Sequence, residues 1–157
     1  CWGLNSSGQL GNSSSINAYK PVAVTGVSTA AQAAAGGRHS CALLSDGTLK
    51  CWGLNIFGQL GNSSFLNASA PVTVTGITTA SGIASGSNHA CSSLTDGTVR
   101  CWGDNSAGQL GILWPLVGAF YMTTSSSPVQ VSLTSVVGMA AGLYHSCARL
   151  SDNRVVC

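Results

Sequence analysis

Three pairs of cysteines are the residues of this chain whose type and spacing could do chemistry. The two members of each pair stand ten residues apart: Cys41 with Cys51, Cys91 with Cys101, and Cys147 with Cys157. A cysteine pair can form a disulfide or bind a metal ion, and a histidine stands two residues before the first member of every pair. The spacing separates these two chemistries, because it determines how the sulfur atoms face one another.

A short β-hairpin between the two cysteines favours the disulfide. Opposed residues of a hairpin have a constant index sum, so pairing Cys41 with Cys51 centres the turn on Asp46. The third residue of a three-residue turn has a positive φ, which Gly adopts most easily and Asn next. The three hairpins have Gly47, Gly97 and Asn153 at this position. The spacing therefore predicts three cross-strand disulfides, each stabilising the fold by roughly 2–3 kcal/mol.

Metal binding is the alternative chemistry. His39, His89 and His145 each precede a cysteine by two positions, and such residues share one face of a strand. Structural zinc sites usually join two close ligand pairs, whereas one hairpin of this kind supplies only three ligands. We therefore predict no metal site. Mass spectrometry of the unreduced chain tests this, because free thiols or bound zinc would contradict the disulfides.

The cysteines also indicate a compartment. Disulfides at this density are typical of an oxidising environment, so we expect an extracellular, secreted or cell-surface protein. Four Asn-x-Ser triplets, the acceptor pattern for N-glycosylation, agree with this location; they begin at Asn5, Asn12, Asn62 and Asn67. By the same spacing the partner of Cys1 would precede residue 1. We therefore expect Cys1 to be unpaired and the chain to be a segment of a longer protein.

One repeat occurs three times along the chain. The segments CWGLNSSGQLGN, CWGLNIFGQLGN and CWGDNSAGQLGI begin at Cys1, Cys51 and Cys101. Each is followed by a proline-led segment, then by a run of small residues ending in Gly-x-x-His, and then by the cysteine hairpin. We therefore interpret the chain as one repeat domain of three tandem units, about 1–50, 51–100 and 101–157.

Four short strands are predicted in each unit. In the first unit they are about 22–24, 31–35, 40–44 and 48–52. Alternating valines in the proline-led segments and glycine-flanked alanine runs favour strands over helices. Four strands in every 40–50 residues or so, repeated along a chain, are typical of β-propeller blades. The chain is therefore expected to be all-β.

The order of these motifs resembles the regulator of chromosome condensation repeat. CWGxNxxGQLG, Pro-Val-x-Val and GxxHSCALLSDG, with small variations, keep their order and spacing in three copies. The resemblance implies four-stranded antiparallel blades of a seven-bladed propeller, with each sequence repeat straddling two blades. The paired cysteines are similar to those of its secreted, mostly bacterial branch. A closed ring would need roughly 350 residues, so three repeats are expected to form an incomplete propeller or an open array.

Composition and missing motifs exclude several functions. Four acidic and six basic residues give a net charge of +2, too small and scattered for nucleic-acid binding. The longest apolar run, 112–122, contains Pro and Gly and is too short for insertion into a membrane. We found no nucleophile motif, phosphate-binding loop or carboxylate pair. We therefore predict no enzyme, no catalytic residue and no cofactor.

The residues that recur in every repeat are expected to be structural. Trp2, Trp52 and Trp102 each follow a cysteine, so they point to the opposite face of the blade, where they can pack between blades. The glutamine of each GQLG motif is expected to hydrogen-bond the backbone of its turn. The three histidines are expected to be buried, hydrogen-bonded residues on strands.

Residues that do not recur are better candidates for binding. The third repeat has ILWPLVGAFYMTTSSS at 112–127, where the first repeat is polar. Exposed aromatic side chains anchor protein interfaces, so four residues of this loop form the predicted partner-binding site: Trp114, Leu116, Phe120 and Tyr121. Alternatively, the loop packs against a neighbouring repeat and fills a gap. Secondary candidates are Ile56-Phe57 and Phe65-Leu66.

The predicted function is a non-catalytic extracellular recognition or adhesion module, which binds a protein or surface macromolecule through its blade loops. Replacing Trp114, Phe120 and Tyr121 with Ser should then abolish partner binding. The alternative is a structural subunit of an extracellular fibre, stalk or surface layer, in which copies of the chain pack head to tail. Electron microscopy distinguishes the two, because discrete rings favour the module and long threads favour the fibre.

Overall fold

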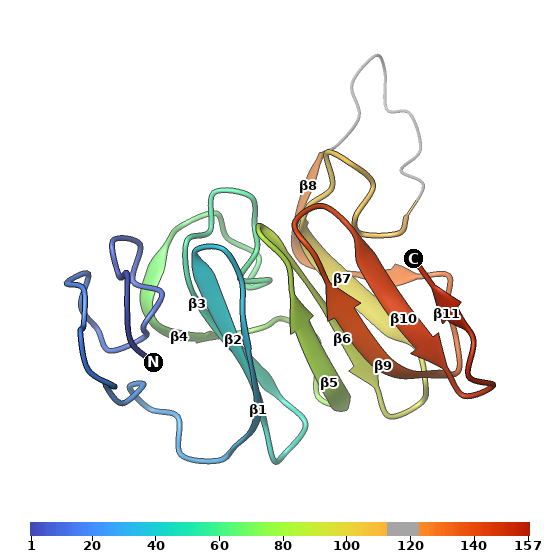
Figure 1. The fold of residues 1–157 in the computed structure, drawn as a ribbon, viewed down its shortest axis with the longest axis horizontal. Helices are drawn as coiled ribbons and strands as arrows, with labels where there is room; N and C mark the ends of the chain where they lie inside the picture. The colour runs from blue at the N-terminus through green and yellow to red at the C-terminus, as the bar shows by residue number, and fades with distance from the viewer. Residues whose placement is uncertain (113–122) are drawn as a thin grey trace.

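The computed structural model describes residues 1–112 and 123–157, and every regular element in this part of the chain is a β-strand. Three antiparallel sheets follow one another (Figure 1). The first contains β1 (Ala30–Ala35), β2 (His39–Leu44), β3 (Leu49–Gly53) and β4 (Ala68–Thr73). The second contains β5 (Ala80–Ser85), β6 (His89–Leu94), β7 (Val99–Asp104) and β8 (Thr124–Val131). The third contains β9 (Val136–Ala141), β10 (Ser146–Leu150) and β11 (Val155–Val156).

Each four-stranded sheet combines parts of two sequence repeats. In the first sheet, β1 and β2 lie within repeat 1–50, whereas β4 lies within repeat 51–100. The strands are ordered as they occur in the sequence, so each sheet is a simple antiparallel meander. The prediction of an all-β fold built from antiparallel propeller blades in an open array is confirmed. None of the described residues forms a helix that could cross a membrane.

Two predicted boundaries are wrong. Residues 22–24 do not form a regular strand; instead Val22 exchanges two main-chain hydrogen bonds with Cys1, of 2.8 and 2.9 Å. The corresponding segments of the later repeats lie in β4 and β8, where a full strand, β3 or β7, pairs with them. The predicted loop at 112–127 is also too long, because β8 begins at Thr124 and includes its last four residues.

The cysteine hairpins have the register that their spacing indicates. Cys41 lies opposite Cys51 in the β2–β3 ladder, and Cys91 lies opposite Cys101 in the β6–β7 ladder. The turn residues Gly47, Gly97 and Asn153 have φ values of 79°, 80° and 69°. The sulfur atoms of all three pairs are joined, and the Cα atoms of each pair are 4.1 Å apart. Among the described residues, no group of His, Cys, Asp or Glu is arranged to hold a metal ion.

We expect the removal of one disulfide to cost about 2–3 kcal/mol of unfolding free energy, because the unfolded chain regains the freedom of a ten-residue loop. The variant is Cys91→Ala/Cys101→Ala, and urea unfolding measures the change. Cys1→Ser is the matched control, since Cys1 is an exposed free thiol and its replacement should leave the unfolding midpoint unchanged. Equal stability of both variants would mean that the cross-link does not constrain the unfolded chain.

The disulfide face of each complete blade packs against the following blade. The core between the first two sheets includes Cys41, Leu43, Leu49, Cys51, Ile83 and Trp102. The core between the second and third sheets includes Cys91, Val99, Cys101, Ala148 and Leu150. Alternate residues of a strand point to opposite faces, so the tryptophan that follows a cysteine faces the preceding blade. The predicted packing between blades is therefore present for Trp52 and Trp102, which are buried, whereas Trp2 is 68% exposed.

Candidate functional site

Residues 54–67 form the loop between β3 and β4, and one buried asparagine holds this loop together. The Asn55 side-chain nitrogen donates hydrogen bonds to the carbonyl oxygens of Ser64 (2.9 Å) and Leu66 (3.0 Å). Its side-chain oxygen accepts a hydrogen bond from the Leu60 amide, at 2.9 Å. Asn55 has no exposed surface, so these bonds do not compete with water. The two halves of the loop are therefore fixed relative to each other.

The same loop is attached to the next blade. The Ser63 amide donates to the Ser126 carbonyl on β8, at 2.8 Å, and the Ser63 hydroxyl lies 3.0 Å from the Ser127 hydroxyl. Gly58 approaches β8 so closely that a Cβ atom would lie 2.5 Å from the Ser126 Cα atom. Only glycine fits there, since its φ of +79° is also positive. Hydrogen bonds within the loop and hydrogen bonds to β8 thus both hold the loop in place.

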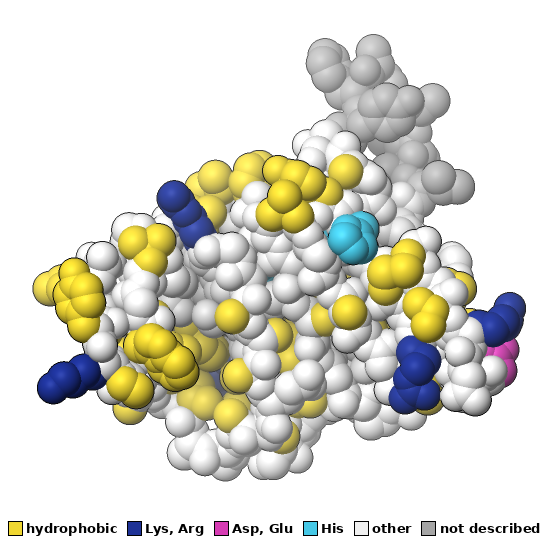
Figure 2. All heavy atoms as spheres, viewed as in Figure 1, with side chains coloured by type: hydrophobic (Ala, Val, Ile, Leu, Met, Phe, Trp, Pro, Cys, Tyr) yellow, Lys and Arg dark blue, Asp and Glu magenta, His cyan; other side chains and the backbone are white. Residues whose placement is uncertain are grey.

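Three large apolar side chains project from this fixed loop into solvent. Ile56, Phe65 and Leu66 are 57%, 51% and 78% exposed, and we call them the loop patch. The loop has no charged residue. Figure 2 shows hydrophobic side chains along the upper edge of the molecule, where Figure 1 places the loop between β3 and β4 and, beside it, the turn between β9 and β10. Exposed apolar side chains on a rigid support are typical of a surface that binds a protein.

The four residues of the predicted partner-binding site lie outside the described residues: Trp114, Leu116, Phe120 and Tyr121. Their role stays a prediction. The loop patch consists of three of the four secondary candidates, while the fourth, Phe57, is half-buried. The sequence signal for the loop patch was the replacement of Ser6 and Ser15 of the first repeat by Ile56 and Phe65 of the second, whereas Leu66 stands where the first repeat has Ile16.

Glycan attachment to Asn5 conflicts with the folded structure. Asn5 is fully buried, and its side-chain nitrogen, the atom that would carry the sugar, donates hydrogen bonds to Asn12, Ser14 and Ile16. The Asn5 amide that would carry the sugar therefore already holds the loop together. Glycosylation of the other candidates stays a prediction; Asn67 is exposed, and Asn12 and Asn62 are half-buried.

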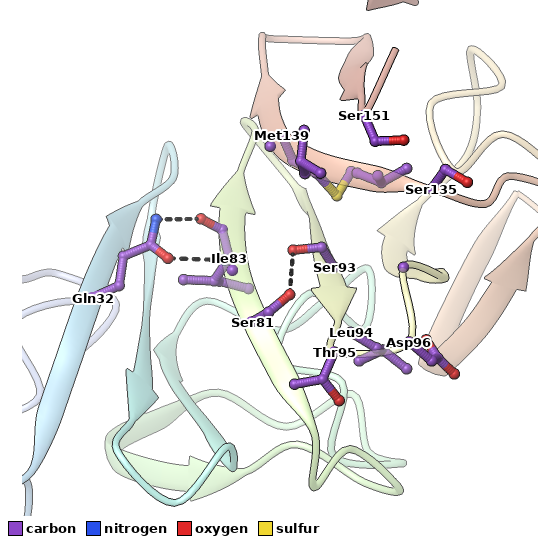
Figure 3. A pocket seen from close by; sticks show the side chains of 15 residues that line it. Gln32, Ser81, Ile83, Ser93, Leu94, Thr95, Asp96, Ser135, Met139 and Ser151 are labelled. Atoms are coloured by element: carbon purple, nitrogen blue, oxygen red, sulfur yellow. Dashed lines mark hydrogen bonds between the residues drawn. The ribbon is translucent and has the colours of Figure 1, made fainter. Parts of the chain in front are cut away.

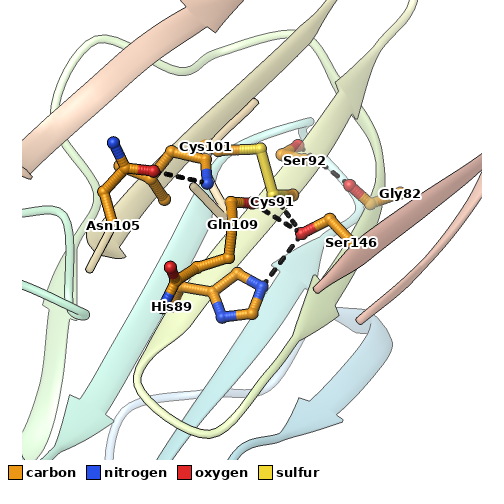
Figure 4. Close-up of a disulfide and its surroundings, with 9 residues drawn as sticks. Gly82, His89, Cys91, Ser92, Cys101, Asn105, Gln109 and Ser146 are labelled. Atoms are coloured by element: carbon orange, nitrogen blue, oxygen red, sulfur yellow. Dashed lines mark hydrogen bonds between the residues drawn. A yellow bond between two sulfur atoms is a disulfide. The ribbon is translucent and has the colours of Figure 1, made fainter. Parts of the chain in front are cut away.

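The three repeated histidines lie in different environments. His89 Nε2 lies 2.9 Å from the Ser146 hydroxyl, which in turn donates to the Gln109 carbonyl (Figure 4). His39 is equally buried, but neither of its ring nitrogens has a hydrogen-bond partner among the described residues. His145 is exposed. The prediction of buried, hydrogen-bonded histidines is therefore right only for His89.

The difference between His39 and His89 comes from the blade that each faces. The position of Ser146 in the third blade is occupied by Ala90 in the second, and a methyl group cannot bond an imidazole. Burial, and to a lesser extent the nearby His89, lowers the pKa of His39 to about 4. Burial also lowers the pKa of His89. Both rings are thus held neutral, and neither is poised for proton transfer near neutral pH.

Ala90→Ser is expected to raise the unfolding free energy by about 1–2 kcal/mol. The new hydroxyl would take the place that Ser146 has in the next blade, so it would bond His39 and the Gln59 carbonyl. Thermal unfolding measures the gain. Ala80→Ser is the control, because Ala80 is equally an alanine buried in the apolar core, and a hydroxyl there should destabilise the fold. A loss of stability in Ala90→Ser would contradict the expectation.

A hollow of about 790 Å³ lies mainly between the second and third blades, and Gln32 of β1 also lines it (Figure 3). Serine hydroxyls line it, and the Ser81 hydroxyl donates to the Ser93 hydroxyl at 3.1 Å. Asp96 is the one carboxylate among its described lining residues. That carboxylate accepts hydrogen bonds from the Thr98 amide (2.9 Å) and hydroxyl (2.7 Å), which lower its pKa. A single carboxylate fixed within a turn cannot perform paired acid–base chemistry.

The family is decided by sequence comparison. The family model described as regulator of chromosome condensation (RCC1) repeat matches residues 1–43, 46–92 and 96–149. A second model with the same description matches residues 30–59 and 80–109. The chain belongs to the RCC1 repeat family. No curated protein matches the chain.

Solved structures with the RCC1 fold are similar to the chain over nearly its whole length. Yeast RCC1 (Prp20) in its complex with Kap60 has a TM-score of 0.81 at 23% identity, covering 98% of this chain and 38% of that one. Human WBSCR16 has a TM-score of 0.79 at 20% identity, with 96% and 39% covered. Prp20p from Saccharomyces cerevisiae, described with its binding to Gsp1p and histones, has 0.76 at 20% identity, with 94% and 38% covered. The chain thus spans about two-fifths of these RCC1-fold proteins, and identities this low indicate the fold alone.

Proposed function

We propose that the chain is a non-catalytic extracellular recognition module that binds a protein partner. The binding surface would combine the loop patch with four large apolar and aromatic residues of the third-repeat loop: Trp114, Leu116, Phe120 and Tyr121. The observation that carries the proposal is the exposure of three large apolar side chains on a loop fixed at both sides. A surface that is already ordered loses little conformational entropy on binding, so it binds more tightly than a flexible one.

Charge and cysteine chemistry support the class of partner and the location. The loop that carries the loop patch has no charged residue, which suits an apolar protein surface better than a phosphate backbone. Three disulfides suit an oxidising compartment. Among the similar structures, yeast RCC1 is bound to the protein Kap60, so a protein with this fold can have a protein partner.

The test removes the apolar groups without disturbing the framework that holds them. The variant Ile56→Ser/Phe65→Ser/Leu66→Ser alters only exposed side chains. The partner is captured from the extracellular fluid of the source organism, identified, purified and titrated against the chain. We expect the loop-patch variant to bind at least about 100-fold more weakly, because central apolar anchors dominate such interfaces.

A matched control keeps this test specific. Val137→Ser/Leu143→Ser/Val155→Ser removes three similarly exposed apolar side chains of the third blade, none of them in the loop that carries the loop patch. Its affinity should stay within about threefold of the parent, as for residues outside a binding hot spot. If both triple variants bound the partner equally well, the loop patch would not be part of the binding surface. A third variant, Trp114→Ser/Phe120→Ser/Tyr121→Ser, tests the other loop separately.

A further inference from the structure

One side chain bridges the first and second blades where their first strands, β1 and β5, lie side by side. The Gln32 side-chain oxygen accepts a hydrogen bond from the Ile83 amide, and its side-chain nitrogen donates to the Ile83 carbonyl, each at 3.2 Å (Figure 3). Ile83 lies on β5, an edge strand of the second sheet, so these main-chain groups have no strand beside them to bond. A primary carboxamide thus takes the place of a strand partner at this edge.

The second and third blades meet in the same way but without this bridge. β5 and β9 lie side by side as β1 and β5 do. The position of Gln32 on β1 is occupied by Gly82 on β5, which has no side chain. Leu43, opposite Gln32 in the first sheet, is replaced by the smaller Ser93 in the second. Both replacements line the hollow of about 790 Å³, so the hollow is the gap that the two larger side chains fill between the first two blades.

The main chain of Met139 offers this hollow the two groups that Ile83 offers Gln32. Met139 has the place on β9 that Ile83 has on β5, and the two strands pair with their neighbours in the same register. Alternate residues of an antiparallel edge strand direct their N–H and C=O away from the partner strand. Ile83 does so, since Gln32 bonds both groups, and Met139 therefore does so too. Apart from β10, no described residue bonds the Met139 N–H or C=O.

The lining of the hollow suits a neutral polar group. Its one described carboxylate, Asp96, already accepts two hydrogen bonds within its own turn, and no basic side chain of the described residues lines it. Five side chains provide hydroxyl groups: Ser81, Ser93, Thr95, Ser135 and Ser151. A primary carboxamide carries its oxygen and one N–H on the same side, so it can bond both main-chain groups of one residue. A trans peptide group has its N–H and C=O on opposite sides and cannot.

We propose that the hollow binds a glutamine side chain of an extended polypeptide partner, and that its carboxamide bonds Met139 as Gln32 bonds Ile83. The volume of the hollow is in the range that holds a drug-sized ligand, so residues on either side of the glutamine fit beside the hydroxyl groups. None of the loop-patch residues lines the hollow. The site therefore goes beyond the proposed function, and its binding can be measured independently of the loop patch.

A peptide copied from the chain itself is the probe. It is residues 30–34, Ala-Ala-Gln-Ala-Ala, with acetyl and N-methylamide caps that leave the glutamine side chain as its only primary carboxamide. Added to the isotope-labelled chain, it should shift the nuclear magnetic resonance signal of the Met139 amide in a saturable way, with a Kd of about 1 mM or below. An unmoved Met139 signal would overturn the proposal.

Two altered peptides test the carboxamide. Replacing the glutamine with glutamate removes the N–H donor, and replacing it with leucine removes donor and acceptor, so each peptide should bind at least about tenfold more weakly. Equal binding of all three peptides would overturn the carboxamide as the recognised group. The single residue N-acetylglutamine N-methylamide should also bind at least about tenfold more weakly, because it lacks the flanking residues. Binding as tight as that of the peptide would overturn the choice of a polypeptide as the partner.

Two variants of Gly82 test the site. Gly82→Gln supplies a carboxamide from within the chain, so it should compete for Met139 and weaken peptide binding at least about tenfold. Gly82→Ala is the matched control and should stay within about threefold of the parent. Both variants carry a Cβ atom 2.8 Å from the Ser93 hydroxyl oxygen, so any adjustment there is common to the two. Equal affinities of the two variants would overturn the proposed site. The altered peptides keep the test decisive if Gly82→Gln fails to fold.

Discussion

Replacing Trp102 with alanine is expected to lower the free energy of unfolding by about 3–5 kcal/mol, the usual cost of deleting a buried tryptophan. Trp102 has no exposed surface, packs against the disulfide face of the first blade, and bonds the Gln59 carbonyl. Its removal leaves both a cavity and an unpaired buried carbonyl. Urea unfolding followed by far-ultraviolet circular dichroism measures the loss.

Trp2→Ala is the matched control for Trp102→Ala. Both tryptophans stand in the same Cys-Trp-Gly sequence, but Trp2 is 68% exposed. Measured in dilute solution, this control should change the unfolding free energy by less than about 0.5 kcal/mol, as exposed substitutions usually do. If both variants lost equal stability, the contact between the indole and the preceding blade would not be the source of the effect.

A pair of glycines separates the packing of Trp102 from backbone strain. Gly61 and Gly76 have positive φ values of +64° and +69°, so alanine strains the backbone at either position. A Cβ atom on Gly61 would lie 2.8 Å from the Trp102 ring, whereas none of the described atoms lies within 4 Å of one on Gly76. Gly61→Ala should therefore cost clearly more than Gly76→Ala. In a Trp102→Ala background the two costs should become equal, because the clash is gone.

Acidification is expected to destabilise the chain between about pH 6.5 and pH 4 because of His39. Burial keeps this ring neutral and lowers its pKa from 6.5 to about 4 in the folded chain. As the pH falls through 6.5, the unfolded chain takes up a proton that the folded chain cannot accept, so unfolding becomes easier. Below pH 4 both states are protonated and the loss stops. The difference in pKa corresponds to about 3 kcal/mol.

His39→Phe tests the origin of this acid sensitivity. Phenylalanine keeps a planar ring and removes two ring nitrogens that have no hydrogen-bond partner among the described residues, so the fold should tolerate it. Urea unfolding at several pH values should show most of the pH dependence removed. The remainder is expected from His89, whose pKa burial also lowers. If the unfolding free energy of His39→Phe depended on pH as strongly as that of the parent chain, His39 would not be the source of the acid sensitivity.

The hairpins could be predicted from the sequence because their determinants are close in the chain. A fixed spacing of ten residues, a turn glycine and a strand period of two together allow one register, and the ladders have it. The strand at 22–24 could not be judged in this way. Its valines alternate as those of β8 do, but a strand also needs a partner, and here the partner is only the short segment around Cys1.

The candidate site was predicted less completely. The replacement of serines by Ile56 and Phe65, next to Leu66, indicated an unusual loop, and the structure shows all three side chains exposed. Nothing in the triplet at Asn5 reveals that its amide holds the loop from inside. The histidines were misjudged for a similar reason, since the partner of His89 is 57 residues away and is absent where Ala90 stands.

The sequence by itself determined the repeat, its family, the blade architecture and the cysteine pairing, since each depends on residue types at short, regular intervals. Only the tertiary structure decided which buried histidine lacks a hydrogen-bond partner and which asparagine amide is enclosed by its own loop. The first outcome depends on contacts between blades, where residues far apart in the chain meet, and the second depends on the path of the loop around the side chain. The repeated motifs are nearly the same in all three copies, whereas the residues that face them from the next blade are not.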